Sequence, residues 1–75
     1  MSALADLPIA GRGRVLRVAG GDEISLRLLE MGLTPGVVVL VVGKAPLGDP
    51  LELEVRGYRL SVRKSEAARV EINPL

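Results

Sequence analysis

The sequence predicts a small, mainly β fold: a partly open antiparallel barrel of five short strands, with one inserted α-helix and a short helical turn. Short strand-favouring segments alternate with glycine- and proline-rich turns, and only one segment has clear helical spacing. The chain has 75 residues, of which 48% are hydrophobic and 25% are charged, as in compact globular proteins. We therefore expect a single domain over residues 1–75.

The first strand and the helix follow one another. Residues 13–18 (GRVLRV) predict a strand that ends at the turn signal Gly20-Gly21. Asp22 is placed to cap the next helix, because its carboxylate accepts hydrogen bonds from free backbone N–H groups. Gly32 and residues 34–36 (TPG) end that helix, since glycine closes a helix and proline prevents its continuation.

This helix is expected to have an apolar face and a charged face. The apolar side chains that recur at helical spacing are Ile24, Leu28 and Met31. Ion pairs on the solvent face are predicted between residues four and three positions apart, namely Glu23 with Arg27 and Arg27 with Glu30.

Residues 37–42 (VVVLVV) predict a strand with two apolar faces. Six β-branched or aliphatic residues in a row favour a strand over a helix, and the segment is too short to cross a membrane. One apolar face belongs to the barrel core. The other face requires cover by the helix, by a second subunit or by another protein.

Two alternating segments around Arg56-Gly57 predict a β-hairpin over residues 51–63. Cross-strand charge pairs are expected between one strand and the other, with Glu52 and Glu54 facing Arg59 and Arg63. Residues 64–69 (KSEAAR) predict one helical turn, and residues 70–72 predict a last strand. Five short strands with these connections are typical of an SH3-like barrel.

Composition excludes several functions. The chain has no cysteine and no histidine, so it offers no thiol nucleophile, no disulfide and no imidazole acid or base. It has no G-x-x-x-x-G-K-[ST] phosphate loop. The residues that could act as a catalytic nucleophile or base have no partner that would activate them; they are Ser25, Thr34, Lys44, Ser61, Lys64 and Ser65. We expect no enzyme. The lack of a basic leader and of a run of about 20 apolar residues favours a cytoplasmic protein.

Three motifs, in their order and spacing, resemble the FeoA family of small SH3-like proteins associated with bacterial ferrous iron uptake. They are RLLEMGLTPG at 27–36, APLGDP at 45–50 and LSVRKSEA at 60–67. The resemblance extends from about Leu7 to Ile72, and it departs from the family pattern at Ser61-Val62, where a more apolar pair is expected. The positions that match the family pattern are Leu28, Gly32, Pro35, Gly36, Ala45, Pro46, Leu47, Gly48, Asp49, Pro50, Arg63 and Ala67.

This resemblance implies a cytoplasmic accessory that docks on and modulates the FeoB ferrous iron transporter, a membrane protein with a cytoplasmic GTP-binding domain. It implies no cofactor and no membrane contact except through the transporter. The alternative is a free-standing regulatory barrel that self-associates or binds another protein or a nucleic acid. A nucleic-acid site is disfavoured, because bases stack on aromatic side chains and the chain has only Tyr58. Homo-oligomerisation is left open.

The APLGDP loop allows two interpretations. In the first, Pro46 and Pro50 restrict a loop that holds Leu47 outward for an apolar pocket on the partner. In the second, the loop is only a turn, with Asp49 bonded to its own backbone and Leu47 in the core. The predicted partner-binding residues are Ala45, Pro46, Leu47, Gly48, Asp49, Pro50, Arg59 and Arg63.

The basic residues of the hairpin also allow two interpretations. Arg56, Arg59, Arg63 and Lys64 either meet an acidic partner or form a solvated face that nearby glutamates neutralise. The net charge of +1 favours the second. The nine carboxylates have no spacing that gathers several hard ligands without imidazole or thiolate help. The sequence therefore predicts no ferrous iron site within one chain and leaves weak metal binding open.

Overall fold

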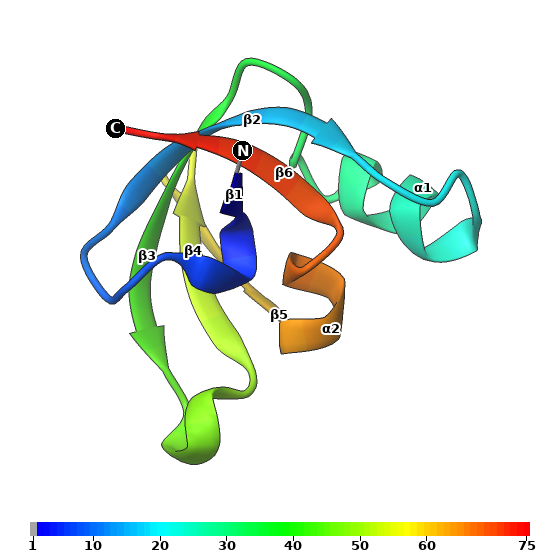
Figure 1. Cartoon of the computed structure of the whole chain (residues 1–75). Helices are drawn as coiled ribbons and strands as arrows, with labels where there is room; N and C mark the ends of the chain where they lie inside the picture. Colours follow the sequence, from blue (N-terminus) through cyan, green and yellow to red (C-terminus); the bar gives the residue numbers. More distant parts are fainter. Residues whose placement is uncertain (1) are drawn as a thin grey trace.

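The computed structural model describes residues 2–75, in which six antiparallel strands form one curled sheet (Figure 1). The strand order across the sheet is β1-β6-β2-β3-β4-β5. The strands are β1 (Ser2–Ala3), β2 (Arg12–Val18), β3 (Val38–Lys44), β4 (Leu51–Val55), β5 (Tyr58–Val62) and β6 (Val70–Pro74). The helical segments are η1 (Leu4–Asp6), α1 (Glu23–Glu30), η2 (Pro46–Gly48) and α2 (Lys64–Ala67).

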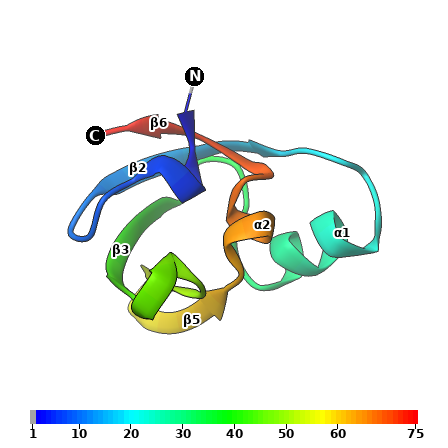
Figure 2. The ribbon, with the colours of Figure 1, turned by 60° about the horizontal axis from the view of Figure 1, so that its bottom comes forward.

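The sheet curls into the partly open barrel that the sequence predicts. Figure 2 shows the strands curving around the interior, with α2 on the open side between β5 and β6 and α1 beside α2. The five predicted strands correspond to β2 to β6. Strand β1 is not among the predicted strands, because two residues cannot show an alternating pattern.

The core is entirely aliphatic. Alternate residues of β3 and β4 supply it, so Val39, Val41, Leu51, Leu53 and Val55 are buried while their neighbours are more exposed. Other elements close it with Leu4, Leu7, Val15, Leu28, Leu33, Val37, Val62, Ala67, Val70 and Ile72. Burial of this apolar area is the main term that stabilises the fold.

The prediction that residues 37–42 have two apolar faces that both need cover is only partly right. Val39 and Val41 are fully buried, whereas Val38, Leu40 and Val42 are half-buried. The strand therefore alternates between the core and a partly covered outer face, as a barrel strand does.

Helix α1 begins as predicted, but its faces differ from the prediction. The Asp22 carboxylate accepts a hydrogen bond from the Ser25 backbone N–H at 3.1 Å, which caps the helix. Leu28 is buried, while Ile24 is 36% exposed, so the prediction for Ile24 is wrong. Fewer side chains of α1 are therefore buried in the core than the helical spacing of its apolar residues predicts.

The ion pairs predicted within α1 are also wrong. Among residues 2–75, Arg27 pairs with Glu66 of α2 and not with Glu23 or Glu30. Helix α2 packs next to α1, which gives the guanidinium a carboxylate from another element. A long-range contact of this kind replaces the local pairs that sequence spacing favours.

Candidate docking site

The APLGDP loop lies at the end of the barrel where β3 passes into β4 (Figure 1). Its backbone closes on itself, because Ala45 N–H donates to the Pro50 carbonyl at 3.0 Å and Gly48 N–H donates to the Ala45 carbonyl at 2.8 Å. The loop therefore has a defined shape and is held by its own hydrogen bonds.

Leu47 stands at the tip of this loop with its side chain fully exposed. The interpretation that placed Leu47 in the core is wrong. Its backbone has φ of 74°, in the left-handed region that a residue with a Cβ adopts at a cost of about 1–2 kcal/mol. A large apolar side chain is thus held in water on a strained backbone.

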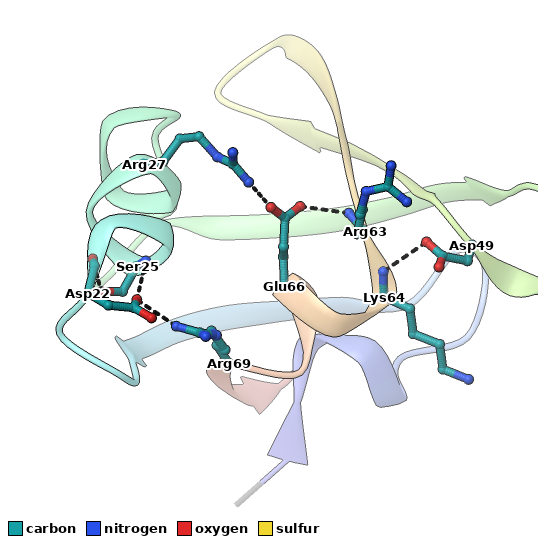
Figure 3. Close-up of polar contacts among 8 residues, drawn as sticks. All are labelled: Asp22, Ser25, Arg27, Asp49, Arg63, Lys64, Glu66 and Arg69. Atoms are coloured by element: carbon teal, nitrogen blue, oxygen red, sulfur yellow. Dashed lines mark hydrogen bonds and ion pairs between the residues drawn. The ribbon is translucent and has the colours of Figure 1, made fainter.

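Asp49 joins the loop to the rest of the molecule. Its carboxylate accepts a hydrogen bond from the Lys64 backbone N–H at 3.0 Å, at the start of α2 (Figure 3). The interpretation in which Asp49 bonds its own backbone is therefore wrong. This contact fixes the loop against α2 and explains why an aspartate stands there.

A polar groove adjoins the loop. It has a volume of about 330 Å³ and is lined by Arg27, Pro50, Ser61, Val62, Arg63 and Glu66. Glu66 lies at its centre, where it pairs with the Arg27 guanidinium and accepts a hydrogen bond from the Arg63 backbone N–H at 2.9 Å (Figure 3). The structure thus brings Pro50 and Arg63 of the predicted site together.

Arg59 lies on the neighbouring strand segment, outside the lining of the groove. The register places it opposite Glu54, and Ser61 opposite Glu52. Within residues 2–75, none of the ion pairs joins Glu52 or Glu54 to Arg59 or Arg63. Glu54 and Arg59 are therefore cross-strand neighbours, but the predicted ion pairs do not form in this part of the chain.

Sequence reasoning missed Arg27 and Glu66 as parts of this site. Glu66 stands three residues after Arg63, the spacing at which a glutamate bonds back to the residue that precedes a helix. That spacing is typical of a capping glutamate. The pattern is hard to recognise in this sequence, because arginine is not a usual N-cap residue. Arg27 offers no such signal, because its partner lies 39 residues away.

A second polar contact ties α1 to the end of α2. The Arg69 guanidinium lies 2.6 Å from the Asp22 carboxylate. This hydrogen bond, together with the one from the Ser25 backbone N–H, lowers the pKa of Asp22 from 3.8 to about 2. The α1 cap is therefore also an ion-pair partner.

Within residues 2–75, no three histidine, cysteine, aspartate or glutamate side chains gather closely enough to hold a metal ion. No helix in the part of the chain that the structure describes has the length and apolar character to span a bilayer.

Comparison with known proteins decides the family. The model of the FeoA domain matches residues 3–74. The chain belongs to the FeoA family. This membership confirms the family resemblance and agrees with the SH3-like fold.

Similar proteins include members with solved structures. A FeoA-like protein from Clostridium acetobutylicum is 34% identical, with a TM-score of 0.92 over 99% of this chain and 86% of that one. A FeoA from Stenotrophomonas maltophilia, solved with zinc, is 35% identical, with a TM-score of 0.85 over 97% and 91%. It is described as a prokaryotic SH3-domain protein and a candidate activating factor of ferrous iron transport.

One relative of this FeoA-family chain carries the domain within a much larger protein. It is an Fe(2+) transport protein A/Fe(2+) transporter FeoB fusion protein from Porphyromonas gingivalis, 35% identical over 69 residues. The match covers 92% of this chain and 8% of the fusion protein.

Proposed function

We propose that this FeoA-family protein is a non-enzymatic, cytoplasmic accessory of ferrous iron uptake. In this proposal, residues 1–75 act as one domain that docks on the cytoplasmic part of a FeoB-type transporter and modulates it. The fusion relative supports the choice of partner, because there a similar domain and a FeoB transporter share one chain. The S. maltophilia protein, described as a candidate activating factor, supports the accessory role.

Leu47 carries the proposal. A fully exposed leucine at φ of 74° is unfavourable twice, since its backbone is strained and its side chain makes no core contact. Neither cost is offset by packing within this chain. A pocket on a partner that buries the side chain would offset both, and strained residues cluster at such contacts.

The shape of the loop supports the same conclusion. The loop is closed by its own hydrogen bonds and held to α2 by Asp49. A side chain presented on a preformed loop loses little further conformational freedom on binding. The site therefore comprises residues 45–50, with Arg59 and Arg63 at its basic side.

A binding titration of Leu47→Ala tests this proposal. The ligand is the cytoplasmic domain of the FeoB-type transporter encoded beside this protein, at physiological salt. We expect the substitution to weaken binding about ten- to a hundredfold, because burying a leucine contributes about 1.5–3 kcal/mol. Thermal unfolding is expected to stay unchanged, since the side chain contacts no core residue.

Leu75→Ala is the matched control. Leu75 is also an exposed leucine, and it lies at the end of the barrel away from η2 (Figure 1). It is expected to bind as the wild type does. A folded Leu47→Ala variant that binds with unchanged affinity would overturn the role of the loop, and a wild type that does not bind would overturn the choice of partner.

A further inference from the structure

In the sheet that residues 2–75 form, β5 is the last strand, and one of its sides has no neighbouring strand. The turn at 56–57 has two residues, both with positive φ, so Val55 and Tyr58 form the first hydrogen-bonded pair of the hairpin. Bonded and non-bonded pairs then alternate along the strand. Arg59 and Ser61 therefore direct their N–H and C=O groups away from β4. Both residues are exposed.

This free edge adjoins the polar groove. Ser61 and Val62 of β5, and Arg63 directly after it, line one side of the groove, while Arg27 of α1 lines the other. Figure 3 shows Arg27 reaching from α1 toward Glu66, with the Arg63 side chain beside β5. The free backbone groups of β5 and the two arginines thus belong to one continuous surface.

The charge of this surface favours an acidic ligand. Arg27 and Arg63 line the groove, and Arg59 lies on β5 opposite Glu54. Glu66 is the carboxylate that lines the groove, and it is already engaged by Arg27 and by the Arg63 backbone. Within residues 2–75, the Arg63 guanidinium forms no ion pair. Carboxylates on a ligand would therefore find, in Arg63, a cation that no ion pair in this part of the chain compensates.

A second copy of this chain is a poor occupant of the edge. Pairing of β5 with another β5 would bring the arginines of the two copies together, and like charges across paired strands are destabilising. Basic residues on an edge strand have this effect generally, since they oppose pairing between identical edges.

We propose that the free edge of β5 binds an extended, acidic segment of the protein partner. The segment adds to the sheet through backbone hydrogen bonds to Arg59 and Ser61, and its carboxylates contact Arg63 and Arg27. This inference rests on the proposed function, and it names the chemistry of the partner segment that binds beside Leu47.

The first test distinguishes the contribution of the Ser61 backbone N–H to binding from that of the Ser61 side chain. Ser61→Pro removes the N–H that faces the free edge, and proline is tolerated on an edge strand where that group is not bonded within the sheet. Ser61→Ala keeps the N–H and is the matched control. We expect the cytoplasmic domain of the transporter to bind Ser61→Pro about tenfold more weakly and Ser61→Ala normally.

The second test concerns charge and remains decisive if Ser61→Pro fails to fold. Arg63→Glu replaces an exposed side chain and keeps the backbone contact to Glu66. It is expected to weaken binding by about tenfold or more, and to reduce the loss of affinity seen between about 0.05 and about 0.5 M salt. Arg12→Glu is the control, because Arg12 is exposed on β2 and gives the same change in net charge.

The outcomes separate this inference from the proposed function. If Leu47→Ala weakens binding while Ser61→Pro and Arg63→Glu bind as the wild type does, the edge proposal is wrong and loop docking stands. If Arg12→Glu weakens binding as much as Arg63→Glu, net charge is the cause and the edge proposal is also overturned. Absence of binding by the wild type overturns both.

Discussion

Leu47 adopts a backbone conformation that suits glycine better than leucine. Its φ of 74° is strained for any residue with a Cβ, and its exposed side chain contributes nothing to the core. At the scale of one residue, the backbone conformation of Leu47 destabilises the fold, while its apolar side chain is exposed to solvent. Substitution of this leucine by glycine is therefore expected to relieve the strain while it removes the apolar side chain.

We predict that Leu47→Gly does not lower the free energy of unfolding and raises it by up to about 1 kcal/mol. Relief of strain, about 1–2 kcal/mol, is partly offset by the greater freedom of glycine in the unfolded chain. Leu26→Gly, at another exposed leucine in the helical backbone of α1, is expected to cost about 1 kcal/mol. Urea unfolding checks both variants, and a similar loss in the two would show that Leu47 is not strained.

At the scale of elements, the end of α1 is fixed to the hairpin by one side chain. The Tyr58 hydroxyl donates a hydrogen bond to the Met31 carbonyl at 2.7 Å, just past the last turn of the helix. Gly32 lies against that hydroxyl, and a Cβ built at Gly32 would overlap it. Gly32 also has φ of 108°. The glycine is required both by the helix ending and by the tyrosine.

We predict that Gly32→Ala lowers the free energy of unfolding by about 1–3 kcal/mol, through backbone strain and displacement of Tyr58. Tyr58→Phe loses only the hydrogen bond, at about 1 kcal/mol. In the double variant the absent hydroxyl leaves room for the Cβ. The double variant should therefore lose less free energy of unfolding than the sum of the losses in the two single variants. Strict additivity in urea unfolding would contradict the contact.

The sequence predicted most elements but not how they meet. The alternation in residues 51–63 predicted β4 and β5, and the cap at Asp22 predicted the start of α1. The ion pair of Arg27 was predicted within α1, because spacing shows only local neighbours. The outward direction of Leu47 was left open for the same reason, since a proline- and glycine-rich motif defines a turn and not the face on which its side chains lie.

At the scale of the whole molecule, two ion pairs hold α1 to the segment around α2. Arg27 of α1 pairs with Glu66 of α2, and Asp22, the N-cap of α1, pairs with Arg69, which follows α2. They attach the inserted helix to the segment that closes the open side of the barrel (Figure 2). A chain of 75 residues buries a small core. Such contacts therefore influence the global unfolding of the molecule and not only a local region.

We predict that the ionised carboxylate of Asp22 stabilises the fold and that this stabilisation is lost in acid. Its folded pKa, about 2, lies below the ordinary value of 3.8, so the contribution is present above pH 3.8 and is lost as the pH falls toward 2. Asp22→Asn keeps a capping side chain but loses the charge. The variant should unfold at a lower temperature than the wild type at pH 7, and the difference should shrink by about pH 2. A difference that is equal at both pH values would exclude this linkage.

The pairing of β1 with β6 has a consequence for protein architecture. Ser2 lies opposite Ile72, so both ends of the chain emerge from the same side of the barrel, while η2 lies at the other side (Figure 1). A further polypeptide joined to either end would begin on the side of the barrel away from Leu47. A covalent tether to another protein at either end would thus raise the local concentration of the APLGDP loop around that protein.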